Sequence, residues 1–511
     1  MTRDVPGETI ADSAALVTAG YAALRSGDFS NARTKFAAAA ELSPRDAAPR
    51  HALGVALRRS GDAAAASAAF LDAARLAPAA LEPILSASEA LLAARDFAAA
   101  IEATNRALKI APGSFQVYGN QAVAYCELGE FQRAEAAFRQ AMRLQPDSPW
   151  LLRSLSLFFR TQGRADDAIE AARRAVARDF DDAESHHTLA LALLSSGHMR
   201  EGWQEYEWRW KLKNLPTTRI ATEKPRLDGA SDTSGQTVLV HAEQGIGDTL
   251  QFVRYLPELR RRCARVVLWI QEAAYPLLAS FPGADRVVWH ARDVGPFDAY
   301  ISTMSLPYVL GLDKIESPTA PYLWPNQQAA AKWQSAFDRE PRGPRVRIVW
   351  AGNPTHVNDR HRSLSASSFA SLVVRYCGQL RFFSLQVGAP DVVGQLRHLP
   401  PGSVTDLSPW LTDYAETAGC LAAFDLVVTV DTSVAHLASA MGRPVWLLLP
   451  YFSDWRWQHA SETTPWYPSM NIYRQNRPGD WDDVFARIAT DMANLERPKT
   501  DRIVEQPAVH S

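Results

Sequence analysis

The first part of the chain repeats itself every 34 residues, and this period limits what it can fold into. Prolines, alanines and mostly aromatic residues recur at this interval: Pro44, Pro78, Pro112 and Pro146; Ala32, Ala66, Ala100 and Ala134; Phe36, Phe70, Thr104 and Phe138. A small residue recurs earlier in each unit, at Gly20, Gly54, Ser88 and Ala122. The pattern predicts stacked antiparallel helix pairs. The small residue lets two helices approach, the aromatic fills the space between pairs, and proline ends the second helix.

The repeat continues beyond these four units with growing departures. A fifth unit (149–182) keeps Gly163, Ala168 and Ala175 but has Phe180 at the proline position. A sixth begins near Ala183, keeps Gly197 and then changes into GWQEYEWRW (202–210). Terminal repeats deviate because they cap the stack or dock on the next domain. We therefore expect a helical array over 1–210, with about six repeats of which the last is degenerate.

These units resemble the tetratricopeptide repeat. The resemblance implies a superhelix whose concave face binds a segment of another protein; the alternative is a scaffold for self-association. The adjacent His186 and His187 would point in different directions on a helix, so we expect no metal site there.

Composition excludes several classes of protein. The 54 basic and 56 acidic residues nearly balance, which argues against binding nucleic acid by bulk charge. The four cysteines are far apart and form no CxxC pair, so neither zinc nor a disulfide framework is expected. No apolar signal region is apparent near the N-terminus, and no stretch approaches the ~18 apolar residues of a membrane span. We expect a cytoplasmic protein.

The second part reads as two α/β domains. A polar connector at 211–234 is followed by alternating short β-rich runs and helical patterns. The Pro/Arg/Gly segment REPRGPR (339–345) separates two such sets. Alternation of this kind predicts parallel sheets covered by helices. We expect Rossmann-like domains at 235–338 and 339–495 that face a cleft, and a flexible tail at 496–511.

Ligands of parallel sheets bind at the carboxyl ends of the strands, so residues there are the first candidates for a site. After the run at 237–242 comes a turn with Gln244, Gly245, Gly247 and Asp248. Leu250 stands where a dinucleotide fingerprint needs its third glycine, and no P-loop occurs. Asp248 is either a helix N-cap or a general base projected by the turn.

A second strand end carries Asp431, Thr432, Ser433 and His436. The start of a helix presents unpaired N–H groups and a positive dipole, which suit a phosphate. Thr432 and His436 would share a helix face. The alternative is a capped core helix with a buried histidine.

Two further strand-end segments and one single residue complete the candidates. The loop WAGNPTHVNDRHRS (350–363) holds Asn353, Arg360 and Arg362, which suit a departing phosphate unless the loop is merely solvated. The segment LLLPYFSDWRWQ (447–458) holds Asp454 and Arg456 among tryptophans, which would stack on a base or sugar or else pack between domains. Gln386, near the end of the run LRFFSLQVG, is a further possible cleft contact.

Together these motifs resemble the heptosyltransferase-like GT-B glycosyltransferases over about residues 235–490. The resemblance implies that Asp248 is the catalytic base and that Asp431, Thr432, Ser433 and His436 bind the donor phosphate. EYEWRW, HAEQGIGDTLQF, WAGNP, VDTSVAHLASAMGRPVW and DWRW are similar to bacterial tetratricopeptide-repeat glycosyltransferases, which include flagellin-modifying enzymes. The architecture is also similar to the protein O-GlcNAc transferases, although their lysine-bearing motif is not recognisable.

The leading hypothesis is an inverting glycosyltransferase that needs no metal and no bound cofactor, with a nucleotide sugar as co-substrate. The repeats would hold an acceptor protein, flagellin being suggested by the resemblance. One alternative is a non-catalytic repeat scaffold with a degenerate nucleotide-sugar domain. Another is a saccharide or lipid-linked acceptor, with the repeats used for localisation.

Overall fold

The computed structural model describes residues 6–213, 219–318, 320–339, 343–356, 358–388, 390–459 and 461–495. The tail expected at 496–511 lies outside the described residues. The chain divides into two compact units. One comprises Met1–Phe159 with Glu170–Asp181, and the other comprises Arg160–Ile169 with Asp182–Ser511.

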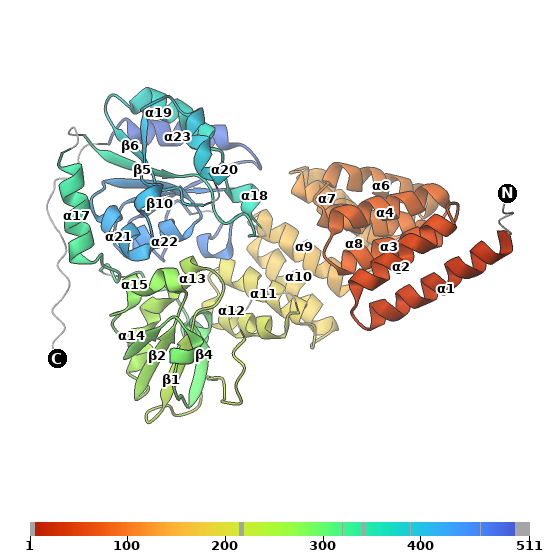
Figure 1. Ribbon diagram of the computed structural model, residues 1–511, viewed down its shortest axis with the longest axis horizontal. Coiled ribbons are helices and arrows are strands. Elements are labelled where there is room, and N and C mark those ends of the chain that lie inside the picture. Colours follow the sequence, from red (N-terminus) through yellow and green to blue (C-terminus); the bar gives the residue numbers. More distant parts are fainter. Residues whose placement is uncertain are drawn as a thin grey trace. The chain divides into compact units, whose positions relative to one another are not determined.

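Antiparallel helix pairs form the first unit, as the repeat predicts (Figure 1). Its helices are α1 (Pro6–Arg25), α2 (Phe29–Leu42), α3 (Ala47–Arg59), α4 (Ala63–Leu76), α5 (Leu81–Ala93), α6 (Phe97–Ile110), α7 (Phe115–Glu127) and α8 (Phe131–Leu144), with most of α9 (Pro149–Thr161) and α10 (Ala165–Arg178). Helices α11 (Ala183–Ser195) and α12 (Met199–Tyr206) continue the array within the second unit. The expected tetratricopeptide array of helices is confirmed.

The recurring residues act as the period suggests. A Cβ on Gly54 would lie 2.6 Å from the ring of Phe70, so the small residue is what admits the aromatic. A further signal with the same 34-residue interval is the aspartate that caps the second helix in each of the first three repeats. Asp28, Asp62 and Asp96 accept hydrogen bonds from the backbone three residues on. Each of these repeats therefore defines its own helix start.

Two parallel sheets follow in the second unit. The first sheet has the order β3-β2-β1-β4, with β1 (Thr237–His241), β2 (Arg265–Trp269), β3 (Arg286–Val288) and β4 (Ala299–Ser302). The second has the order β10-β9-β8-β5-β6-β7, with β5 (Arg345–Val349), β6 (Arg381–Ser384), β7 (Val404–Asp406), β8 (Leu426–Val430), β9 (Val445–Leu449) and β10 (Met470–Arg474). The expected pair of α/β domains is confirmed, and both sheets agree with a GT-B fold.

Helices cover both faces of the second sheet. Residues of α19 (Ala370–Tyr376) and α23 (Trp481–Met492) share one core with β5, β6, β8 and β9, whereas α21 (Tyr414–Ala422) and α22 (Ser433–Ala440) pack on the opposite face (Figure 1). Strand order reverses direction at β1 and at β5. Crevices open at such switch points, so the loops after β1, β5 and β8 are placed where a ligand binds.

The two sheets bring these loops together. Helix α13 (Ile246–Phe252), which follows β1, packs against α22, which follows β8. The approach is close, since a Cβ on Gly247 would lie 2.9 Å from Cδ2 of His436. Only glycine fits there.

The domain limits that the sequence predicts, at 210, 234, 338 and 495, stay a prediction. In the structure β1 begins at Thr237 and β5 at Arg345.

The last repeat belongs to the same core as the first sheet. Trp203 and Tyr206 of α12 are almost fully buried and pack with Phe252 of α13 and Trp455.

Across the described ranges, no helix is both long and apolar enough to span a bilayer.

Candidate functional site

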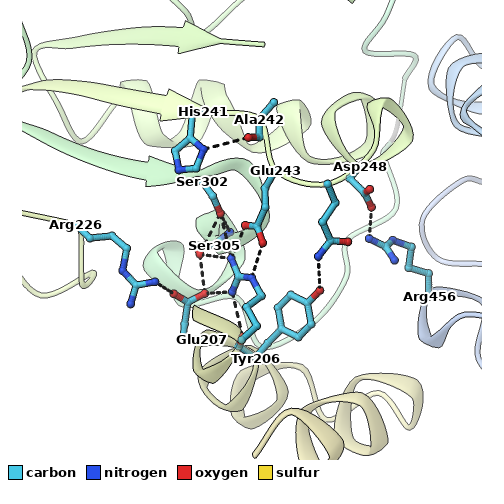
Figure 2. Close-up of polar contacts among 12 residues, drawn as sticks. Tyr206, Glu207, Arg226, His241, Ala242, Glu243, Asp248, Ser302, Ser305 and Arg456 are labelled. Carbon is cyan, nitrogen blue, oxygen red and sulfur yellow. Dashed lines mark hydrogen bonds and ion pairs between the residues drawn. The ribbon is translucent and has the colours of Figure 1, made fainter. Parts of the chain in front are cut away.

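Asp248 lies in the first turn of α13 and makes two different contacts. Its Oδ2 accepts a hydrogen bond from the backbone N–H of Gly245 at 2.9 Å. Gly245 is the N-cap of α13, so Asp248 caps the helix from its third position and not as the N-cap residue that the sequence suggested. Its Oδ1 forms an ion pair with Nη2 of Arg456, which belongs to the other α/β domain (Figure 2). Burial raises the pKa of Asp248 above its ordinary value, and Arg456 and the Gly245 N–H offset only part of this effect. The carboxylate of Asp248 therefore caps the start of α13, and its raised pKa makes it a stronger base than an ordinary aspartate.

Arg456 contacts residues of both α/β domains. Its guanidinium donates to Gln251 of α13 (2.8 Å) and to Asp454 on its own loop (2.8 Å), besides Asp248. The side chain is only 8% exposed and lies over the ring of Trp455. The predicted cleft residues Asp248, Asp454 and Arg456 thus form one cluster.

Asp431 organises the start of α22. Its Oδ2 accepts a hydrogen bond from the indole N–H of Trp457 (2.9 Å), and its backbone carbonyl accepts one from Arg362 (3.0 Å). Burial and then the charge of Asp454 raise the pKa of Asp431 to about 6. Thr432 is the N-cap residue of α22. Its hydroxyl forms a hydrogen bond with the hydroxyl of Thr429 (3.2 Å) and not with a backbone N–H of the helix.

His436 has the surroundings of a core histidine. It is 5% exposed, its Nδ1 bonds the hydroxyl of Tyr467 at 2.8 Å, and its ring stacks on Trp457. Burial and then the charge of Arg456 lower the pKa of His436 to about 3, so the ring is neutral at physiological pH. A contribution of imidazolium charge to phosphate binding is therefore not expected.

The loop after β5 divides into two parts. Arg362 is 12% exposed and reaches Asp431, as already described. Asn353 instead folds onto Thr355 (3.0 Å), and Arg360 donates to neighbouring His361, both on the exposed side of the loop. The structure thus brings Arg362 to the start of α22 and leaves Asn353 and Arg360 at the surface.

Gln386, a possible cleft contact from the sequence, is bonded to the backbone at the end of β5. The side chain is 2% exposed, and its amide binds the backbone of Trp350 and Ala351 at the end of β5 and that of Val387. Backbone groups at the edge of the sheet need partners, and Gln386 supplies them. Its role is to shape the strand end.

The tryptophans near Asp454 are packed against other side chains and are not open to a ligand. Trp455 and Trp457 are nearly fully buried, the first against Trp203 and the second against His436. Packing between domains describes Trp455, whereas Trp457 packs within the second α/β domain. One exposed tryptophan was missed: Trp410, which follows β7, is 54% exposed.

A buried ionic cluster beneath Asp248 was also missed. Arg209, fully buried after α12, donates to both oxygens of Glu243 (2.8 and 2.7 Å) and to Glu207 (2.6 Å). Ser302 and Ser305, at the end of β4, bind the same guanidinium (Figure 2). The available signal was the oppositely charged pair Glu207 and Arg209 inside the tryptophan-rich segment EYEWRW.

Through this cluster, the end of the repeat array packs against the carboxyl ends of the strands of the first sheet. Tyr206 continues it toward the site, because its hydroxyl accepts a hydrogen bond from Gln244 (3.2 Å), which has a left-handed φ of 60°. Gln244 is thus held by the last repeat, shortly before Asp248 in the chain. Burial raises the pKa of Tyr206 to about 12, so its hydroxyl stays protonated.

Within the described residues, no group of three or more His, Cys, Asp and Glu side chains could hold a metal ion. Positive potential at the site comes from Arg362, Arg456 and the start of α22.

Comparison with known proteins agrees with this architecture. The tetratricopeptide repeat model matches residues 17–80, 85–149 and 120–184, and the model of glycosyltransferase family 9 (heptosyltransferase) matches 387–479. The second range contains Asp431 and Arg456. The chain is a tetratricopeptide-repeat protein that carries a glycosyltransferase family 9 domain.

Among curated proteins, the chain is similar to Protein FlbA of Caulobacter vibrioides, with 26% identity over 352 residues. The match covers 63% of this chain and 57% of that relative. Two similar solved structures are a thermophilic tetratricopeptide-repeat protein of Thermus thermophilus (23% identity, TM-score 0.32, 36% of this chain and 99% of that one) and MamA of Desulfovibrio magneticus (20%, 0.29, 33% and 93%).

We predict that Arg209→Met destabilises the protein by about 3–5 kcal/mol, because it removes the cation that balances the buried charge of Glu243. Arg226→Met is the matched control. Arg226 pairs with Glu207 at 3.1 Å but is 33% exposed, so its loss should cost less than about 1 kcal/mol. Thermal unfolding of the full chain measures both, and equal shifts would contradict the assignment.

We also predict that Asp431→Asn raises the melting temperature at pH 8. A carboxyl whose folded pKa is about 6 binds its proton more tightly when folded, so the stability it contributes is lost as pH rises from about 4 through about 6. Asparagine removes this loss and can still accept the Trp457 hydrogen bond. The gain should vanish near pH 4, and a gain of equal size at pH 4 and pH 8 would contradict the raised pKa.

Proposed function

We propose that the protein is an inverting glycosyltransferase that moves a sugar from a nucleotide sugar to an acceptor hydroxyl without a metal ion. The observation that carries the proposal is the meeting of Asp248, from one domain, with the start of α22, from the other. Transfer needs a base at the acceptor and positive charge at the leaving phosphate, and each domain supplies one of them.

In this reaction the acceptor oxygen forms a bond to the anomeric carbon while the bond from that carbon to the phosphate oxygen breaks. The phosphate keeps the electron pair of the broken bond, and the acceptor proton passes to Asp248. A single displacement inverts the anomeric centre. The raised pKa of Asp248 supports its role as base, and the cap leaves further lone pairs on the carboxylate to accept the proton.

The donor phosphate would bind at the start of α22. The first amides of a helix have no acceptor within it, and the helix dipole adds positive potential. Thr432 and Ser433 place hydroxyls there, Arg362 lies beside them, and Asn353 and Arg360 lie on the same loop as Arg362. The exposed ring of Trp410, after β7 of the same sheet, is of the kind on which nucleobases stack.

The acceptor would be a protein held by the repeats, and flagellin is suggested by the resemblance of the sequence. A cavity in the first unit supports docking of a polypeptide. It is lined by apolar side chains of α5, α7 and α9, among them Leu92, Val123 and Leu157, with Glu89 and Asn120 at its polar side. Exposed apolar surface in a concavity suits an apolar side chain of a partner.

Two alternatives remain distinct from this proposal. A non-catalytic scaffold would not need a strengthened carboxylate beside a phosphate-binding helix, and the chain has a carboxylate of raised pKa beside the start of α22. A saccharide or lipid-linked acceptor would use the same catalytic site but not the cavity of the repeats.

We predict that Asp248→Asn lowers the transfer rate by about 100-fold or more, because asparagine can accept the Gly245 hydrogen bond but cannot take the proton. Mass spectrometry of a candidate acceptor protein incubated with a nucleotide sugar measures the rate. Asp413→Asn is the control, since Asp413 is another aspartate that caps a helix: it is the N-cap of α21 and accepts from the N–H of Glu416 at 2.8 Å. Wild-type activity of Asp248→Asn would remove Asp248 from the mechanism.

We predict that Leu157→Glu raises KM for a protein acceptor by about 10-fold and leaves hydrolysis of the donor unchanged. Leu157 is 45% exposed within the cavity, and a carboxylate there would remove an apolar contact worth about 1.5 kcal/mol or more. Leu42→Glu is the control, because Leu42 is 39% exposed but lies outside the cavity. An unchanged KM would favour an acceptor that does not dock on the repeats.

A further inference from the structure

Asp454 has a free oxygen in the middle of the site. It follows β9 and caps the short helix Trp455–Trp457, and its Oδ1 accepts hydrogen bonds from the backbone N–H (3.0 Å) and Nη1 (2.8 Å) of Arg456. These two bonds fix the orientation of the carboxylate. In the described part of the chain, Oδ2 receives no hydrogen bond, and 35% of the side chain is exposed.

The charge of Asp454 reaches the groups on both sides of the site. It raises the pKa of Asp248 in one domain and that of Asp431 in the other. Burial alone would raise the pKa of Asp454 itself, but Arg456 and, to a smaller extent, Arg160 hold it below the ordinary value, so the carboxylate is ionised at neutral pH.

Asp454 lies beside the position that the transferred sugar would occupy, because Arg456 joins it directly to Asp248. In the proposed reaction the anomeric carbon lies between the acceptor hydroxyl, which is held by Asp248, and the phosphate, which is held at the start of α22. Of the acids in the cluster, Asp454 is the one whose charge acts on both Asp248 and Asp431 while one oxygen is open.

We propose that Oδ2 of Asp454 binds a ring hydroxyl of the sugar that is transferred, and so determines which sugars the site accepts. The proposal rests on the proposed function. An ionised carboxylate only accepts hydrogen bonds, so the matching ligand is a sugar with an unsubstituted hydroxyl at this point. Hydrogen bonds to a charged partner are stronger than neutral ones, which makes this contact a selective one.

The variant Asp454→Asn tests the contact in the full chain. Asparagine keeps the Oδ1 acceptor that caps the helix and replaces Oδ2 by an amide that donates. Calorimetry compares UDP, GDP, ADP and CMP with UDP-glucose, GDP-mannose, ADP-glucose and CMP-N-acetylneuraminate, using the pair that the wild type binds best. We expect Kd for the nucleotide to change less than twofold and Kd for the nucleotide sugar to rise about 10-fold or more.

Two further variants control this experiment. Asp480→Asn changes another capping aspartate, which accepts from Asp483 at the start of α23, and should alter neither affinity. Asp454→Ser keeps a capping group but removes the carboxylate, so it should reproduce the selective loss if Asp454→Asn does not fold.

Equal losses for nucleotide and nucleotide sugar would overturn the proposal, since Asp454 would then act on the phosphate site or on the loop. Unchanged affinity for both would also overturn it. A wild-type chain that binds none of the eight probes would contradict the proposed function itself, which separates that failure from failure of the sugar contact.

Discussion

The candidate site depends on the ion pair between Arg456 and Asp248, because these residues belong to different sheets. Arg456 contacts Asp248 and Gln251 in the first α/β domain while it is anchored on Asp454 in the second. A guanidinium has five donors in a fixed plane, so one side chain can satisfy three partners at once. Without Arg456, the carboxylates of Asp248 and Asp454 would lose the cation that lies between them.

The last repeat belongs to the same compact unit as the candidate site and is not an appendage to it. Arg209 fills the carboxyl edge of the first sheet, and Tyr206 holds Gln244 just before Asp248. A fully buried arginine is stable only when its charge is matched, and here Glu207 and Glu243 match it. The segment at 202–210 therefore departs from the repeat pattern at the residues that contact the turn before Asp248.

Much of the architecture could be predicted from the sequence because its signals are local. The 34-residue period specifies helix pairs, and alternation of strands and helices specifies parallel sheets, whose strand ends then point to Asp248 and Asp431. The sequence could not show which polar residues bond to backbone or pack inside. Gln386 serves the end of β5, and His436 stacks in the core, because elements far apart in the chain surround them. Arg209 was missed for the same reason, since its partners lie up to 96 residues away.

The proposed function requires that this chain attaches a sugar to another protein. Intact-mass spectrometry of the proteins of its source cells, with and without the gene, tests this most directly. We predict that at least one protein loses the mass of a glycan when the gene is absent and regains it when the wild-type gene is restored. Identical protein masses in both cells would contradict the proposed function.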